Sequence, residues 1–220
     1  IRQFEFELQY EHLMDWRWDL ETRSTRLTPL GIRFETGDEF SFQVEQLYER
    51  LLPEDEFEIG GVPIRAGEYN TVRWMAELET ASQRKVAADA RVEFGEFWSG
   101  RRNEYGLGVT MRPWSGVNLG VEYEFNDVDL AEGAFTTSLF RIDGGWHFSP
   151  WISFTGNVQY DDVSDIVGVY TRFRWIVKPG SDLYLVYTHN WLSEGSRLWD
   201  FRGSTVSQGL ATKLAYTHRF

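Results

Sequence analysis

The sequence contains no cysteine, and this absence removes several kinds of site at once. Without a thiol the chain has no disulfide framework, no thiolate metal centre and no cysteine nucleophile. It also lacks any run of about 18 apolar residues, so no segment has the composition of a transmembrane helix. No basic segment followed by an apolar one precedes Ile1. We therefore expect either a processed mature chain or part of a longer one.

Positive charge is scarce as well. Lys and Arg number 22 against 34 Asp and Glu, which gives a net charge of −12. Nucleic-acid binding needs clustered Lys and Arg, so this balance argues against a nucleic-acid partner. Aromatic residues, in contrast, make up 16% of the chain and include 10 Trp. The chain is therefore rich in large apolar rings without being uniformly apolar.

Alternation of apolar and polar residues runs through the whole chain. In "FEFELQYEHLMDWRWDL" the even positions are mostly apolar or aromatic and the odd positions mostly charged. Successive side chains of a strand point to opposite faces, so this period of two predicts strands. No convincing amphipathic helix is found. The pattern predicts about twelve strands, at residues 1–20, 25–36, 39–51, 69–82, 86–98, 103–112, 117–127, 135–148, 151–161, 167–178, 182–192 and 206–220.

The predicted strands are long, and their connections alternate in length. Most strands exceed the ~5–6 residues usual in globular domains and reach the ~9–11 that cross a membrane. Short turns are predicted at 36–38, 83–85, 113–116, 149–150 and 178–181, and longer loops at 21–24, 52–68, 99–102, 128–134, 162–166 and 193–205. Outer-membrane barrels have short periplasmic turns and longer outside loops.

These features predict an all-β fold, a transmembrane antiparallel up-and-down β-barrel of about twelve strands, with residues 1–220 as one domain. In lipid every backbone N–H and C=O must be paired within the protein, which closed barrels achieve. Trp114, Trp151 and Trp175 lie near predicted periplasmic turns, and Trp16, Trp18, Trp98, Trp191 and Tyr160 near predicted outer ends, as aromatic girdles require. The alternative is a soluble β-sandwich, whose strands also alternate. We further expect that the barrel is either complete or part of a larger one.

The last strand, "GLATKLAYTHRF", places Leu214, Tyr216 and Phe220 on one mostly apolar face. An aromatic last residue with apolar residues at alternate positions before it resembles the C-terminal signal of bacterial outer-membrane barrels. The resemblance implies insertion by the outer-membrane barrel assembly machinery. The expected surroundings are therefore outer-membrane lipid and lipopolysaccharide, with other protein chains of a membrane complex as further candidate partners.

A second resemblance is carried by "QYDDVSD", "RFRW" and "PGSDLYLVY" within residues 158–191. This stretch resembles an uncharacterised family of bacterial outer-membrane proteins, a domain of unknown function. In that family an N-terminal domain similar to carbohydrate-binding β-sandwiches precedes a C-terminal barrel. Segments such as "GEYNTVRW" and "GEFWSGRR" resemble the same barrel part. The resemblance implies a location in the outer membrane and no particular chemistry.

Catalytic and metal-binding patterns are weak. His147 and Ser149 form a His-x-Ser pair like that of an outer-membrane phospholipase of twelve strands, but we expect them on the lumen face with no third group. The acidic loop clusters lack EF-hand spacing. We predict no catalytic residue, no cofactor and no metal site, with an outer-membrane hydrolase as the disfavoured alternative.

Charged residues of the polar phase are the remaining candidates. The expected lumen charges are Glu45, Glu77, Glu93, Glu122, Glu124, Arg91, Arg172 and Arg174. An excess of acids would favour cations in an open pore. The same residues could instead fill a narrow barrel as cross-bracing Glu–Arg pairs. Two functions stay open: a porin-like pore or transport barrel with an acidic lumen, and a non-conducting anchor for a sugar-binding-like domain or partner protein.

Overall fold

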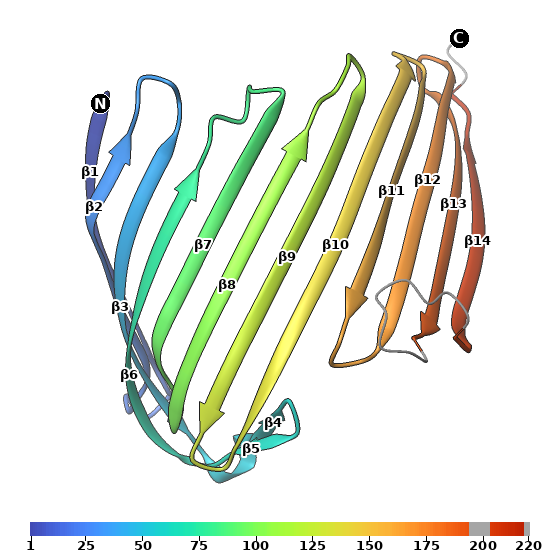
Figure 1. Cartoon of the computed structure of the whole chain (residues 1–220). Helices are drawn as coiled ribbons and strands as arrows, with labels where there is room; N and C mark the ends of the chain where they lie inside the picture. Colours follow the sequence, from blue (N-terminus) through green and yellow to red (C-terminus); the bar gives the residue numbers. More distant parts are fainter. Residues whose placement is uncertain (194–202, 218–220) are drawn as a thin grey trace. The chain divides into compact units, whose positions relative to one another are not determined.

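The structure is a computed structural model that describes residues 1–193 and 203–217, and it is built almost entirely of strands (Figure 1). The elements in chain order are β1 (Gln3–Met14), β2 (Leu20–Arg33), β3 (Glu39–Leu51), η1 (Pro53–Asp55), β4 (Phe57–Ile59), β5 (Val62–Ile64), β6 (Gly67–Glu79), β7 (Val86–Phe97), β8 (Gly100–Met111), β9 (Val117–Leu130), β10 (Gly133–Ser149), β11 (Ile152–Asp161), β12 (Ile166–Lys178), β13 (Ser181–Leu192) and β14 (Thr205–Ala215). The predicted all-β class is confirmed.

Twelve of the strands form one sheet in the order in which they occur along the chain, apart from the separate hairpin of β4 and β5. This is the up-and-down antiparallel arrangement predicted from the sequence. The order begins at β1 and ends at β14, so within the described residues the sheet is not closed on itself. Closure into a barrel stays a prediction. No helix within the described residues is both long and apolar enough to cross a membrane.

The chain divides into two compact units, which we describe separately. Unit 1 contains residues 1–83, 87–107 and 124–137, and unit 2 contains residues 84–86, 108–123 and 138–220. Strands β1 to β3, β6 and nearly all of β7 belong to unit 1, and β11 to β14 belong to unit 2. Strands β8, β9 and β10 contribute residues to both.

The predicted first strand, residues 1–20, is too long. Strand β1 ends at Met14, and residues 15–19 form a turn in which the Asp15 carboxylate accepts hydrogen bonds from the backbone N–H groups of Arg17 and Asp19, at 2.8 and 2.9 Å. Trp18 adopts a positive φ of 68° in this turn. The alternation continues through Trp16 and Trp18, so the pattern alone does not reveal the reversal.

Two of the predicted long loops are tight turns instead. Only residues 98–99 separate β7 from β8, and only residues 131–132 separate β9 from β10. Trp98 takes a positive φ of 48°, which a two-residue hairpin turn requires and which a Trp rarely adopts. The predicted alternation of short and long connections is therefore wrong at 99–102 and 128–134. Long connections are found after β3 and after β13.

Each unit has one polar and one apolar face. In unit 1, Glu45 of β3 lies opposite Arg26 of β2 and Arg73 of β6, so these charges share a face. In unit 2, Phe154 of β11 lies opposite Trp146 of β10 and Phe173 of β12, on the apolar face. The period of two predicted from the sequence is thus realised in the register.

The apolar side chains of both units are strongly exposed. In unit 1, Phe6 is 73% and Leu8 68% exposed, and in unit 2, Leu210 is 75% exposed. The charged residues, in contrast, include the buried Glu93 and Glu104. A sheet of a water-soluble domain buries its apolar face and exposes its charged one. Unit 1 has the opposite distribution, and unit 2 likewise exposes its apolar face.

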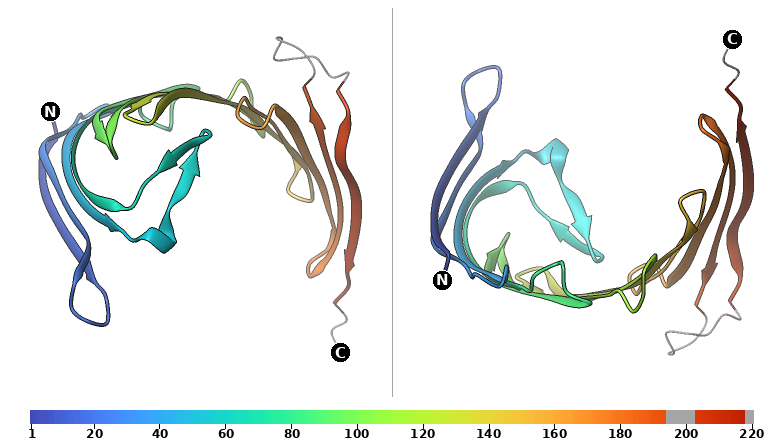
Figure 2. Two further views of the ribbon diagram at one scale, coloured as in Figure 1. Left: turned by 90° about the horizontal axis from the view of Figure 1, so that it is seen from below. Right: turned by 90° about the horizontal axis from the view of Figure 1, so that it is seen from above.

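An additional hairpin of β4 and β5 lies within the long connection after β3 and was not predicted from the sequence. Figure 2 shows it folded over one face of the unit 1 strands. Val62 and Ile64 of β5 are buried against Val128 and Leu130 of β9, with Phe97 and Trp98 packed around them. The hairpin therefore covers an apolar patch at one end of the polar face.

Candidate functional site

The polar face of unit 1 carries a chain of ion pairs that crosses five neighbouring strands. Arg26 of β2 lies 3.0 Å from Glu45 of β3, and Glu45 lies 3.1 Å from Arg73 of β6. Arg73 in turn lies 2.9 Å from Glu93 of β7. Arg102 of β8 then approaches Glu93 to 2.8 Å. Because acids and bases alternate along the chain, each strand is tied electrostatically to the next.

Glu93 is the centre of this network. Its carboxylate oxygens lie within 3.2 Å of the guanidinium groups of Arg73, Arg91 and Arg102, and the residue is 5% exposed. Glu104, which is 8% exposed, contacts Arg91 at 3.3 Å and Arg102 at 3.0 Å. A buried carboxylate is tolerated only when it is paired and hydrogen bonded, and here both are. We refer to Arg26, Glu45, Arg73, Arg91, Glu93, Arg102 and Glu104 as the ion-pair network.

A second part of the same face is acidic. A recess of about 150 Å³ is lined by five carboxylates and one guanidinium group, those of Glu5, Glu7, Glu39, Glu77, Glu79 and Arg33. Arg33 lies 2.7 Å from Glu39 and 3.6 Å from Glu5. The carboxylates outnumber the single cation, so the recess attracts cations and repels anions. We call it the acidic recess.

The β4–β5 hairpin is held in place by more than apolar contacts. Glu56 accepts a hydrogen bond of 3.0 Å from the backbone N–H of Ala66 and lies 3.7 Å from Arg65, which ties the two ends of the hairpin together. Trp98 packs edge-on against both Phe57 and Tyr69. Trp98 was predicted to belong to an outer aromatic girdle, and this prediction is wrong because its ring packs against the hairpin.

The polar face of unit 2 is less strongly charged. Arg141 of β10 lies 3.0 Å from Glu122 of β9, and Arg174 of β12 lies 3.1 Å from Asp182 of β13. Arg172 lies on the same face, opposite Thr155 and Val186, and is exposed. Ion pairing here is local and joins only neighbouring strands.

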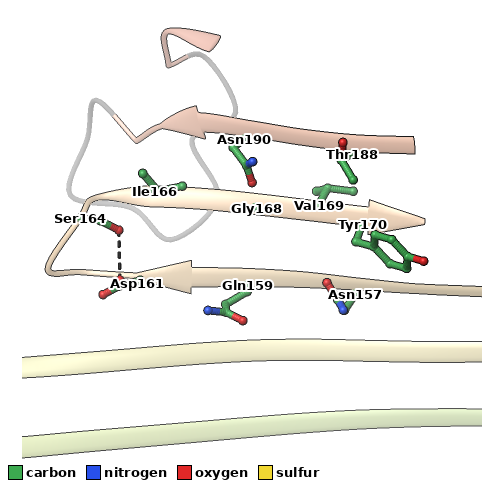
Figure 3. A pocket seen from close by; sticks show the side chains of 10 residues that line it. All are labelled: Asn157, Gln159, Asp161, Ser164, Ile166, Gly168, Val169, Tyr170, Thr188 and Asn190. Carbon is green, nitrogen blue, oxygen red and sulfur yellow. Dashed lines mark hydrogen bonds between the residues drawn. The ribbon is translucent and has the colours of Figure 1, made fainter. Parts of the chain in front are cut away.

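Unit 2 also contains a polar recess of about 310 Å³ (Figure 3). Asn157, Gln159 and Asp161 of β11 lie along one side of it, and Thr188 and Asn190 of β13 along the other. The strand between them, β12, contributes Gly168 and Tyr170. Most of the lining side chains are uncharged amides and hydroxyls. We call it the amide recess.

Six of the eight predicted lumen charges fall into three groups, and Arg172 and Glu124 lie outside them. Glu45, Glu93 and Arg91 come together in the ion-pair network, and Glu77 lines the acidic recess. Glu122 and Arg174 form the local pairs of unit 2, with Arg141 and Asp182, while Arg172 forms no ion pair within residues 1–193 and 203–217. Glu124 lies in the part of β9 that belongs to unit 1 and accepts a hydrogen bond from Asn126. Their predicted role in ion selectivity stays a prediction.

Several residues of the network were missed from the sequence. Arg102 and Glu104 lie at the start of β8, which was predicted to begin at residue 103. The signal was present, because Arg102, Glu104 and Gly106 continue the period of two that the later residues of this strand show. Arg26 lies within the predicted strand 25–36 but was not singled out, because Ser and Thr residues surround it in β2.

The predicted insertion signal is only partly within the described residues. Leu214 and Tyr216 are 71% and 65% exposed, and the Tyr216 hydroxyl accepts a hydrogen bond of 3.2 Å from Lys178. Lys178 also lies over the Tyr216 ring. Phe220 lies outside the described residues.

The His-x-Ser pair has a structural role. The hydroxyl of Ser149 accepts hydrogen bonds from the backbone N–H groups of Trp151 and Ile152, at 3.2 Å each, and so closes the β10–β11 turn. The backbone N–H of His147 donates to the Gly116 carbonyl. A nucleophile needs a base in hydrogen-bond reach, and Ser149 is instead used as a turn acceptor.

The acidic loop clusters are likewise occupied by turn contacts. Asp161 accepts a hydrogen bond of 3.0 Å from the Val163 N–H. It also accepts one of 3.1 Å from the Ser164 hydroxyl (Figure 3). Glu132 accepts a hydrogen bond from Ser99. In residues 1–193 and 203–217 no group of three or more His, Asp or Glu side chains has an arrangement that could hold a metal ion.

Comparison with known proteins adds little to this geometry. No protein-family model matches the chain, and no curated protein matches it in sequence. A solved structure of the NanC porin is similar with a TM-score of 0.36 and 10% identity, over 97% of this chain and 100% of that chain.

Proposed function

We propose that the chain is a β-barrel of a bacterial outer membrane whose polar face lines a pore that favours cations. The observation that carries this proposal is the exposed apolar face of both units together with the buried charge on the polar face of unit 1. Phe6, Leu8 and Leu210 are exposed on the apolar face, whereas Glu93 is buried on the polar one. Lipid solvates an apolar face, and closure of the sheet in a membrane would place the polar face around a lumen.

The acidic recess supports the preference for cations. Glu77 and Glu79 of β6 lie on its wall together with three further carboxylates, against the single guanidinium group of Arg33. Rings of carboxylates select cations in pores because they raise the local cation concentration and exclude anions. Contacts with lipopolysaccharide, insertion by the barrel assembly machinery and membership of the uncharacterised outer-membrane family belong to the same proposal.

A non-conducting barrel is the second candidate, and a specific observation favours it. The ion-pair network and the β4–β5 hairpin both occupy the polar face of unit 1. Side chains fill the interior of small barrels, whereas only wide barrels keep an aqueous channel. In that case the protein would serve as an anchor for a sugar-binding-like domain or for a partner chain.

Single-channel conductance distinguishes the two functions. The full chain is refolded into a planar bilayer, and the reversal potential is measured across a salt gradient. We expect current steps with a preference for cations. In the double variant Glu77→Gln/Glu79→Gln the reversal potential should move toward that of a non-selective pore.

The matched control is Glu54→Gln/Glu58→Gln, which removes the same charge from the connection after β3, where both residues are exposed. Its reversal potential should equal that of the original chain. An inserted protein that carries no current would contradict the pore and favour the anchor. Equal shifts in both double variants would show that net charge, and not the acidic recess, sets the selectivity.

A further inference from the structure

The amide recess of unit 2 differs from the rest of the polar face in its chemistry. Asn157, Gln159 and Asn190 supply three carboxamides, and Thr188 supplies a hydroxyl (Figure 3). Each carboxamide offers both a carbonyl acceptor and an N–H donor. The recess therefore presents donors and acceptors side by side with little net charge.

Most of these groups are available to a ligand. Among the residues that the structure describes, the side chains of Asn157, Gln159 and Tyr170 have no hydrogen-bond partner. All three are partly buried, so their surroundings already restrict their conformations. Asn190 donates to Ser207 at 2.9 Å, which orients its amide and leaves its carbonyl oxygen free to accept. A half-buried polar group without a partner is destabilising, and a ligand that forms a hydrogen bond with it removes this cost.

Gly168 forms the floor of the recess. Register places it between Gln159 of β11 and Asn190 of β13. A Cβ atom built at this position would lie 2.9 Å from the Asn190 side-chain oxygen. Glycine within a strand often marks a place where another molecule approaches the backbone closely. The space above Gly168 exists because this residue has no side chain.

The lining also limits which ligands fit. Asp161 is the only charged residue that lines the recess, and its carboxylate accepts hydrogen bonds from Val163 and Ser164. An anionic ligand would find no opposite charge there, and an apolar ligand would leave the carboxamides unpaired. A volume of about 310 Å³ lies at the lower end of the ~300–1,000 Å³ usual for small-molecule sites.

We infer that the amide recess binds a neutral sugar of one or two rings. Neighbouring hydroxyls of a sugar ring act as donor and acceptor at once, which matches the carboxamides of Gln159 and Asn157. The ring of Tyr170 offers an apolar surface for the C–H face of the sugar. The inference rests on the proposed function in one respect, namely that solutes in water reach the polar face.

Calorimetry tests this inference without any measurement of current. The full chain is refolded in a detergent that contains no sugar and is titrated with maltose and with cellobiose. Triethylene glycol, a neutral polyether without a sugar ring, serves as the comparison solute. We expect saturable binding of at least one disaccharide and none of triethylene glycol.

Four variants locate the site. Gly168→Val fills the floor of the recess and should abolish binding, whereas Gly144→Val adds the same group to the apolar face and should leave it unchanged. Gln159→Ala should weaken binding roughly fivefold, as expected for the loss of one hydrogen bond. Tyr170→Leu should weaken it as well, whereas Tyr123→Leu on the apolar face should not. Binding that survives in Gly168→Val would overturn the inference, as would folded protein that binds neither disaccharide.

These outcomes are separate from those of the conductance experiment. A conducting protein that binds no disaccharide would refute the sugar site and leave the pore intact. A silent protein that binds maltose or cellobiose would refute the pore and support the sugar site, since calorimetry depends only on access to the polar face.

Discussion

Arg73 places one guanidinium nitrogen 2.9 Å from the buried carboxylate of Glu93 and the other 3.1 Å from Glu45. These two acids lie on the strands to either side of β6. A single side chain therefore joins β3, β6 and β7 across the polar face. Loss of an acid from such an arrangement leaves arginines that are partly buried and have lost a partner.

Glu93→Gln should therefore destabilise the fold. Glu93 faces three guanidinium groups, of which Arg73 and Arg102 are largely buried while Arg91 is 43% exposed and screened by solvent. We expect the free energy of unfolding to fall by about 2–3 kcal/mol, somewhat less than for a fully buried pair. The measurement is urea unfolding in lipid vesicles, followed by tryptophan fluorescence.

Glu79→Gln is the control for this experiment. Glu79 is exposed, lies on the same face and is not part of the ion-pair network. Its free energy of unfolding should stay within about 0.5 kcal/mol of the original value. A loss of the same size in both variants would assign the effect to net charge instead of to the network.

Cysteine labelling should show that the β4–β5 hairpin is packed against the sheet. Because the chain has no cysteine, a single introduced thiol is the sole target of a maleimide. Ile64→Cys should react slowly, since Ile64 is 1% exposed, and Glu58→Cys on the neighbouring strand should react quickly. Equal labelling rates in the folded protein would show that the hairpin does not stay on the polar face.

Adjacent residues of β13 should respond oppositely to an introduced charge. Leu185 lies on the exposed apolar face and Val186 on the polar face, opposite Arg172. In a membrane, Leu185→Glu should lower the free energy of unfolding by about 1–2 kcal/mol, because an acidic side chain on the lipid face costs less than Arg or Lys but is still unfavourable. Val186→Glu should be tolerated, since Arg172 can pair with it.

The readout is the fraction of folded protein in vesicles as a function of urea concentration, seen as the band of altered mobility in unheated gel samples. Efficient folding of Leu185→Glu together with failure of Val186→Glu would mean that the apolar face is not the one in contact with lipid.

The Asp15 carboxyl group, in the turn after β1, should titrate at a lower pH than an ordinary aspartate. The backbone N–H of Asp19, and that of Arg17, hold the pKa of Asp15 below its ordinary value, with Arg50 acting in the same direction. This group therefore stabilises the turn above its ordinary pKa, and the contribution is lost as pH falls through the lowered value. The carboxyl chemical shift of Asp15 should report that midpoint, and an ordinary midpoint would contradict the turn geometry.

The strands of the sheet could be predicted from the sequence because period-two alternation survives in most of them. The predicted range 39–51 coincides with β3. The reversal at Asp15 could not be predicted, because Trp16 and Trp18 keep the alternation through the turn. The β4–β5 hairpin left a signal, since Gly60 and Gly61 separate two triplets, FEI and VPI, that each begin and end with an apolar residue. It was hidden within a segment interpreted as loop.

Only the charged residues of the candidate sites could be predicted from the sequence. Glu45, Glu93 and Arg91 follow from the polar phase of their strands, but their pairing depends on the exact register between neighbouring strands. The amide recess depends on Gly168 and on uncharged side chains. A search for charged clusters or catalytic patterns therefore passes over it.

The packing of the β4–β5 hairpin also sets an order of assembly. Successive strands of the sheet are neighbours in the chain, so they can add one after another through local contacts, which favours rapid folding. Val62 and Ile64, in contrast, pack against Val128 and Leu130, which follow them by more than sixty residues. The hairpin therefore reaches its final position only after β9 has joined the sheet, and it is among the last parts of unit 1 to form.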